Sequence, residues 1–213
     1  MSQRALSSIL LFTLSLLFLL VRLHFTIKRR REFGKTRRDE NSIAREGKAD
    51  FTFPRILIGP VIPTFILICA INPSWMRCIQ FPHPVWGMGI GTVMTLGGIA
   101  FLAWTHACLG KEWSVSLQLR DDHRLIQSGP YARVRHPMYT SLFAIYIGLA
   151  LVSNNYGIML LVIMVVISLL LRVPKEEDRM IEKFGDECRD YILKTGRFFP
   201  RLPDVSLEKL NDI

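Results

Sequence analysis

The chain has 213 residues, of which 50% are hydrophobic and only 21% are charged, and its mean hydropathy is +0.27. This composition excludes a disordered chain, a collagen-like fibre and a disulfide scaffold. The four cysteines are scattered without a CxxC pair, so they indicate neither a zinc site nor a disulfide framework. The net charge of +9 would suit a nucleic-acid-binding protein, but the basic residues follow the apolar runs in the pattern of a membrane protein.

The first apolar run predicts a membrane helix. It is uncharged from Ala5 to Val21, and Leu23 to Ile27 extend it past Arg22, which approaches the roughly 20 residues needed to cross a bilayer. No small-residue cleavage pattern follows the run; the basic residues 28–31 follow instead, as after a stop-transfer segment. We therefore predict a retained helix rather than a cleaved signal peptide, with Arg22 snorkelling toward the same interface.

Four further apolar segments predict more membrane helices. Within the third span, Gly87 and Gly91 have GxxxG spacing, which we interpret as packing within the chain rather than as a dimer interface. The last two segments are short and are separated by the turn signal 153–155, so we expect a helical hairpin. The sequence thus predicts an all-α polytopic membrane protein with about five spans, the last four lying at about 56–71, 84–109, 138–152 and 156–171.

Positive charge predicts the orientation of these spans. Nine Lys and Arg residues lie between positions 28 and 53, five between 110 and 135, and nine from position 172 onward, whereas the connection after the second span has only Arg77. By the positive-inside rule the three basic segments are cytoplasmic and the N-terminus is outside, in agreement with five crossings. Contact with anionic lipid is the alternative role of the basic residues, and nucleic acid is not an expected partner.

Residues 123–139 form the first candidate site. This stretch gathers two His, three Arg and two Tyr around the turn at Gly129 and Pro130, and then enters a membrane helix at a His-Pro step. Proline suits the first turn of a helix, so His136 would lie at the interface, with Tyr139 one turn into the membrane. A belt of aromatic and cationic residues at the interface is the simpler explanation.

Residues 172–178 form the second candidate site, at the end of the fifth span. Pro174 suggests the start of a new helix, whose acidic first turn would complement the helix dipole. That helix is expected to be amphipathic, with Gly185 as a point of close packing and an apolar stripe that covers the membrane surface or the mouth of the bundle. The stripe consists of Met180, Phe184, Cys188 and Tyr191.

The hairpin would bring the two candidate sites together. Arg172 and Glu176 are one helical turn apart and would emerge on the same side of the membrane as His136 and Tyr139. Such a cleft would suit a polar cofactor that meets a lipid-like substrate. The sequence contains no HExxH, GxSxG or P-loop pattern and no Rossmann fingerprint, so hydrolysis is not indicated and no metal site is expected.

Three segments resemble a known family. GPYARVRHPMY, then RVPKEE one hairpin later, then FGDECRDY resemble the signature of the isoprenylcysteine carboxyl methyltransferases, which integral-membrane phospholipid methyltransferases share in part. The resemblance runs from about Trp113 to Pro200 and implies methyl transfer that depends on S-adenosylmethionine. It implies that Arg172 contacts the substrate, as the candidate catalytic and substrate-binding residue. The positions that it assigns to the cofactor are His123, Arg124, Leu125, Ile126, Tyr131, His136, Pro137, Met138, Tyr139 and Glu176.

The resemblance leaves parts of the chain unassigned. The family usually has glycine where this chain has Ser141, and the N-terminal half carries no matching motif. We therefore divide the chain into N-terminal membrane helices at 1–109, with their basic loop, and a methyltransferase-like region at 110–213. A prenylcysteine-type carboxylate is the favoured methyl acceptor. A phospholipid headgroup, the oligomeric state and the host membrane, whether bacterial inner membrane or endoplasmic reticulum, stay open.

Two alternatives belong to other classes. The first is a sterol-type membrane reductase, because a cluster of arginines could clamp the phosphates of NADPH. The second is a non-catalytic membrane scaffold whose basic loops bind anionic lipid. The arginines of the possible phosphate clamp are Arg120, Arg124, Arg133 and Arg135.

Overall fold

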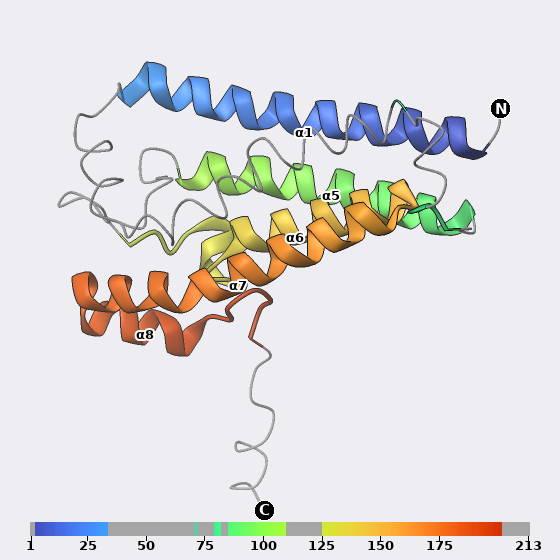
Figure 1. Ribbon diagram of the computed structural model, residues 1–213. Helices are drawn as coiled ribbons and strands as arrows, with labels where there is room; N and C mark the ends of the chain where they lie inside the picture. The colour runs from blue at the N-terminus through green and yellow to red at the C-terminus, as the bar shows by residue number, and fades with distance from the viewer. Residues whose placement is uncertain (1–2, 34–70, 72–78, 82–84, 110–124, 202–213) are drawn as a thin grey trace, which may run out of the picture.

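The computed structural model describes residues 3–33, 71, 79–81, 85–109 and 125–201, and in this part of the chain it is helical, without a strand (Figure 1). Helix α1 packs on α5 and α6, α6 packs along α5, and α7 packs on α6 (Figure 1). The helices are α1 (Gln3–Phe33), α5 (Val85–Leu109), the short 3-10 helix η4 (Gly129–Ala132), α6 (Pro137–Ser153), α7 (Tyr156–Phe184) and α8 (Asp186–Lys194).

Helix α1 confirms the first predicted membrane helix and packs on the rest through one apolar face. Leu11 and Leu14 of α1 are buried in a core shared with α5, α6 and α7. The snorkelling of Arg22 stays a prediction; its half-buried side chain lies beside the buried Tyr146 of α6. A polar partner stabilises a partly buried arginine, and the contact adds to the packing of α1 on α6.

Small residues let α5 and α6 approach closely. A Cβ added at Gly91 of α5 would lie 2.6 Å from the carbonyl oxygen of Gly148 in α6, and one added at Gly98 would lie 2.8 Å from Ile145 Cγ1. These separations are too short for any side chain at the two glycines. The packing of Gly91 within the chain, which the sequence predicted, is therefore confirmed.

The predicted hairpin is formed by α6 and α7. Asn154 turns the chain in a left-handed conformation with a φ of 49°, which asparagine tolerates better than most residues. The side chain of Asn155 then caps α7 by accepting hydrogen bonds from the backbone N–H groups of Gly157 (2.8 Å) and Ile158 (3.2 Å). Two asparagines thus form the turn predicted at 153–155: Asn154 reverses the direction of the chain, and Asn155 caps α7.

The prediction of a helix start at Pro174 is wrong, because α7 continues through this residue to Phe184. The acidic residues that follow are therefore in the interior of a long helix, where they do not complement a helix dipole. Proline removes one backbone hydrogen bond, but polar contacts of Arg172, Glu176 and Glu177 brace the helix on both sides of it. Tertiary contacts thus override the local signal.

The helix that was expected to continue past Gly185 ends there instead. Gly185 has a φ of 56° and a ψ of −127°, a conformation open to glycine and costly for other residues, and α8 begins at the next residue. Within the described part of the chain, a Cβ at Gly185 would meet nothing within 4 Å. The glycine therefore lets the chain change direction between α7 and α8, and the close packing that we predicted at this position is absent among the described residues.

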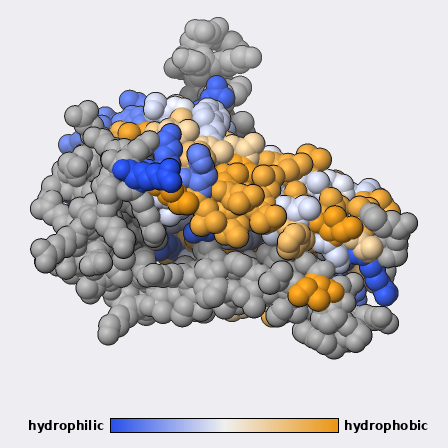
Figure 2. All heavy atoms as spheres, turned by 90° about the horizontal axis from the view of Figure 1, so that it is seen from above, coloured by the Kyte–Doolittle hydropathy of each residue, from blue (hydrophilic) through white to orange (hydrophobic). Residues whose placement is uncertain are grey.

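Apolar side chains cover much of the outer surface of the helices. Figure 2 shows them gathered in a continuous area in the middle of one face, with hydrophilic side chains toward its ends. By length and composition, α1, α5 and α7 could each cross a membrane, and α6 is a shorter apolar helix. The predicted span at 56–71 lies outside the described residues except for Ile71, so these four helices are the spans that can be compared with the prediction.

Candidate functional site

The site begins where the chain enters α6. Pro137 occupies the first turn of α6, as predicted, and His136 is the residue before it. The rings of His136 and Tyr139 stack nearly parallel, with centroids 5.7 Å apart and planes at 8°. The His-Pro step thus fixes two aromatic faces side by side at the start of the helix.

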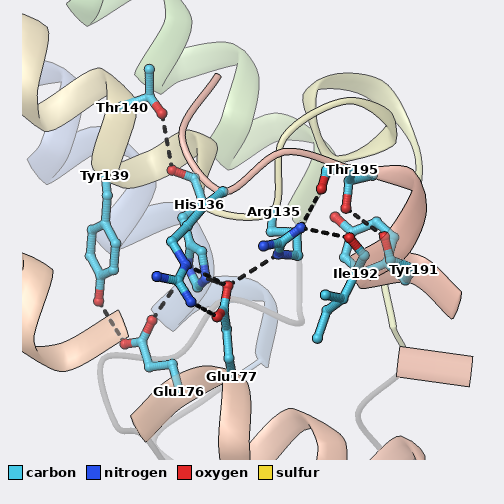
Figure 3. Close-up of polar contacts among 10 residues, drawn as sticks. Arg135, His136, Tyr139, Thr140, Glu176, Glu177, Tyr191, Ile192 and Thr195 are labelled. Atoms are coloured by element: carbon cyan, nitrogen blue, oxygen red, sulfur yellow. Dashed lines mark hydrogen bonds and ion pairs between the residues drawn. The ribbon is translucent and has the colours of Figure 1, made fainter. Parts of the chain in front are cut away.

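Glu176 of α7 faces these two rings. Its Oε1 accepts a hydrogen bond from the Tyr139 hydroxyl at 2.6 Å, while Oε2 lies 3.6 Å from His136 Nδ1 (Figure 3). Oε1 also accepts from Arg172 Nε at 2.9 Å. The four residues that the sequence placed in one cleft are therefore together. The Oε2–Nδ1 separation is too long for a hydrogen bond, so Oε2 keeps capacity to accept one.

Glu177, which the sequence analysis did not single out, is the most heavily bonded acidic side chain at the site. Its carboxylate accepts from Arg135 Nε at 3.1 Å and lies 3.2 Å from His136 Nε2 (Figure 3). It also pairs with the Arg197 guanidinium. The residue is buried, at 7% exposed. His136 is thus held between two adjacent carboxylates, one at each ring nitrogen.

A C-terminal strap, residues 195–198, runs beside the entrance of α6. It forms backbone hydrogen bonds from Arg135 N to Gly196 O (2.9 Å), from His136 N to Arg197 O (3.0 Å) and from Gly196 N to Arg133 O (3.1 Å). The Thr140 hydroxyl also donates to the carbonyl of Phe198 at 2.7 Å. The strap therefore pairs with the segment that precedes α6, through a parallel β-bridge between Val134 and Gly196.

Helix α8 supports the site from the other side. The Tyr191 hydroxyl donates to the backbone carbonyl of Tyr131 in η4 at 2.7 Å, and Arg135 Nη1 donates to the carbonyls of Ile192 (2.9 Å) and Thr195. Burial raises the pKa of Tyr191 to about 12, so its hydroxyl remains a donor at neutral pH. Burial likewise raises the pKa of Tyr131 well above its usual value.

The remaining predicted residues are distributed around this centre. His123 and Arg124 lie outside the described residues. Leu125 and Ile126 are half-buried ahead of η4, and the neighbouring Gln127 donates to Glu187 Oε1 of α8 at 3.2 Å. Tyr131 and Pro137 are buried, and Met138 packs against the apolar core.

Ser141 fits the helix without disturbing it. The residue is fully buried, and its hydroxyl donates to the Pro137 carbonyl at 2.8 Å, within the same helix. A hydroxyl satisfied in this way needs no partner from elsewhere. The departure from glycine at this position therefore leaves the arrangement of His136 and Tyr139 intact.

The chemistry of the site suits a cationic, polar ligand. Glu176 offers a carboxylate oxygen, and the stacked rings of His136 and Tyr139 offer π-faces, which attract cations. Among the described residues no group of His, Cys, Asp and Glu could hold a metal ion. These side chains could hold a cationic group of a polar cofactor.

Comparisons with known proteins agree with the resemblance seen in the sequence. Residues 90–182 match the sequence model of the Isoprenylcysteine carboxyl methyltransferase (ICMT) family. The Protein-S-isoprenylcysteine O-methyltransferase of Schizosaccharomyces pombe is 31% identical over 90 residues, which cover 42% of this chain and 38% of that protein. The part of the chain that contains the site is thus similar to this methyltransferase family, in agreement with the resemblance.

Two further similarities extend over more of the chain. The Cobalt-zinc-cadmium resistance protein CzcN of Cupriavidus metallidurans is 27% identical over 151 residues, 70% of this chain and 64% of that protein. The solved structure of the eukaryotic intramembrane Ras methyltransferase ICMT aligns with a TM-score of 0.47 and 20% identity, over 79% of this chain and 55% of that one. The matched part of this chain spans less than two thirds of each of these proteins.

Proposed function

We propose that this chain, whose residues 90–182 match the ICMT family, is an integral-membrane methyltransferase that uses S-adenosylmethionine and methylates the carboxylate of a prenylcysteine-type substrate. The observation that carries the proposal is the contact of Glu176 with both Tyr139 and Arg172. This contact joins the RHPMY and RVPKEE segments, which the resemblance assigns to cofactor and substrate.

Each side chain has a task in this reaction. When bound, S-adenosylmethionine supplies an electrophilic methyl group. Glu176 accepts hydrogen bonds from the polar part of the cofactor, and the faces of His136 and Tyr139 stabilise its positive charge. The Arg172 guanidinium binds the carboxylate of the acceptor, and its pairing with Glu176 fixes its direction.

The kind of methyl acceptor decides whether the site needs a general base. A carboxylate is already a nucleophile at neutral pH, so its methylation needs no general base. The protein then has to position two reactants in line and to keep water away from them. An amine or hydroxyl acceptor would instead require a base to take its proton.

The surface of the helices supports a substrate that arrives from the bilayer. Large apolar side chains are exposed along α1, α5 and α7, among them Leu20 (54%), Val93 (71%) and Leu171 (69%). Leu171 directly precedes Arg172, so the apolar surface of α7 reaches the candidate site. A lipid-like group could thus remain in the membrane while its carboxylate meets Arg172.

The first test is calorimetry on the detergent-purified chain titrated with S-adenosylhomocysteine, with Glu176→Ala as the variant. We expect micromolar binding by the wild type and a loss of at least about 100-fold in the variant, because a charged hydrogen-bond acceptor is removed from a half-buried site. Glu182→Ala, an exposed position on the same helix, is the matched control and should bind as the wild type does.

Two outcomes would contradict the proposal. Unchanged affinity in Glu176→Ala would remove the cofactor site from this carboxylate. A folded wild type that binds NADPH but not S-adenosylhomocysteine would favour the reductase. If the cofactor site is verified, transfer of a labelled methyl group to a prenylcysteine analogue, compared with a phospholipid, identifies the acceptor.

A further inference from the structure

We propose that Glu177 is a positioning residue that holds the C-terminal strap against His136 by contacting both His136 and Arg197. Held in this way, the strap lines one side of the cofactor site. The inference rests on the proposed function and deepens it, because it concerns how the same site is assembled. It assigns a task to the strap, residues 195–198, and to Arg197 in particular.

The first support is the set of groups that converge on one carboxylate. Glu177 contacts Arg135 and His136, which lead into α6, and Arg197, which comes from the strap. The side chains of Glu177 and Arg135 are each only 10% exposed. A buried carboxylate is stable only with such partners, and its removal would leave the buried charge of Arg135 without a counter-charge from Glu177. Glu177 therefore joins segments that lie far apart in the sequence.

The second support is the orientation of the His136 ring. An ionised carboxylate can only accept a hydrogen bond, so Nε2, 3.2 Å from Glu177 Oε1, carries the hydrogen. This bond turns the opposite nitrogen, Nδ1, toward Glu176 Oε2. Glu177 thus acts on the cofactor site through His136, without touching the cofactor itself.

The third support is where the strap places its aromatic side chain. The ring of Phe198 lies 6.1 Å from that of His136 and 5.3 Å from that of Phe143 on α6, centroid to centroid. The Thr140 hydroxyl holds the Phe198 carbonyl at 2.7 Å. A strap fastened in this position shields the His136 ring from water, which strengthens the electrostatic contacts around it.

The test compares Glu177→Gln with Glu182→Gln, an exposed glutamate on the same helix, in the full-length chain in detergent micelles. Hydrogen exchange is measured without cofactor for the peptides that contain the amides of Arg135, His136 and Gly196. We expect exchange to be about tenfold faster or more in Glu177→Gln, because a buried charge pair is lost, and unchanged in Glu182→Gln.

The second readout separates positioning from general stability. The affinity of the folded fraction for S-adenosylhomocysteine should fall about tenfold in Glu177→Gln, since His136 and the wall formed by Phe198 are no longer held. A merely structural role would lower the melting temperature and the folded fraction, while the folded fraction would bind as the wild type does. That result would overturn the proposal.

A third variant keeps the test decisive if Glu177→Gln does not fold. Arg197→Gln removes the partner on the strap and leaves Glu177 paired with Arg135, so the buried carboxylate stays neutralised. It should show the same faster exchange and weaker binding, and unchanged values of both would also overturn the proposal. A wild type that does not bind S-adenosylhomocysteine refutes the proposed function instead, whereas the exchange experiment still reports whether Glu177 holds the strap.

Discussion

At the scale of single residues, two adjacent glutamates have different partners in the site. Successive residues of a helix point about 100° apart, so Glu176 and Glu177 face different neighbours. Glu176 faces Tyr139 and Arg172, while Glu177 faces the buried side of the site. His136 lies between them and contacts both.

A buried tyrosine gives a prediction about alkaline pH. Because burial raises the pKa of Tyr191 from 10.0 to about 12, the folded state holds the proton more tightly than the unfolded state does. The stabilisation is complete below pH 10 and is lost as the pH rises through about 12. The melting temperature of the wild type should therefore fall between these pH values.

The variant Tyr191→Phe isolates this contribution. At neutral pH it should lose about 1 kcal/mol, because the hydrogen bond to the Tyr131 carbonyl disappears, and its melting temperature should fall less above pH 10 than that of the wild type. Thermal unfolding in detergent between pH 7 and about 12 measures both effects. Tyr156→Phe, at an exposed position, serves as control, and an identical alkaline fall in all three proteins would contradict the prediction.

At the scale of elements, the contact of α5 with α6 depends on particular glycines. In Gly91→Ala the new Cβ would lie 2.6 Å from the Gly148 carbonyl oxygen, so the two helices must move apart. We expect a loss of about 1–3 kcal/mol, seen as a lower melting temperature in detergent. The matched control is Gly97→Ala on the same helix, where a Cβ meets nothing within 4 Å in the described part of the chain. Equal loss in both variants would show that helix contact is not the cause.

Helix boundaries show where a local sequence pattern predicts the structure and where it does not. The start of α6 at Pro137 agrees with the prediction, because proline there loses no hydrogen bond. Pro174 carries the same signal but lies inside α7, and Gly185, expected within a helix, separates α7 from α8. Contacts made by Arg172, Glu176 and Glu177 explain why α7 continues through Pro174. The backbone freedom of glycine explains why the helix ends at Gly185.

At the scale of the whole molecule, the turn between α6 and α7 should lie on the opposite side of the membrane from α8. The tail from residue 172 onward has nine Lys and Arg residues, which favours a cytoplasmic location for α8. In a cysteine-free background, Tyr156→Cys should react with an impermeant maleimide added outside intact cells. Lys194→Cys should react only after the membrane is permeabilised, and labelling of both from one side would contradict the predicted topology.

The sequence by itself determined the kind of protein and the centre of its site. Apolar run lengths and basic loops predicted the membrane helices, because a bilayer imposes its thickness and its charge asymmetry on any chain that crosses it. The spacing of the RHPMY and RVPKEE segments predicted that His136, Tyr139, Arg172 and Glu176 meet, because a tight turn between two helices leaves few other arrangements.

Only the tertiary structure decided what surrounds that centre. The contacts of Glu177 with Arg197 and of Tyr191 with Tyr131 link positions that no helical period or motif spacing connects. The continuation of α7 through Pro174 depends on the same long-range contacts. Hydrogen bonds and ion pairs between distant segments form only when folding brings those segments together, and local sequence patterns do not encode such pairings.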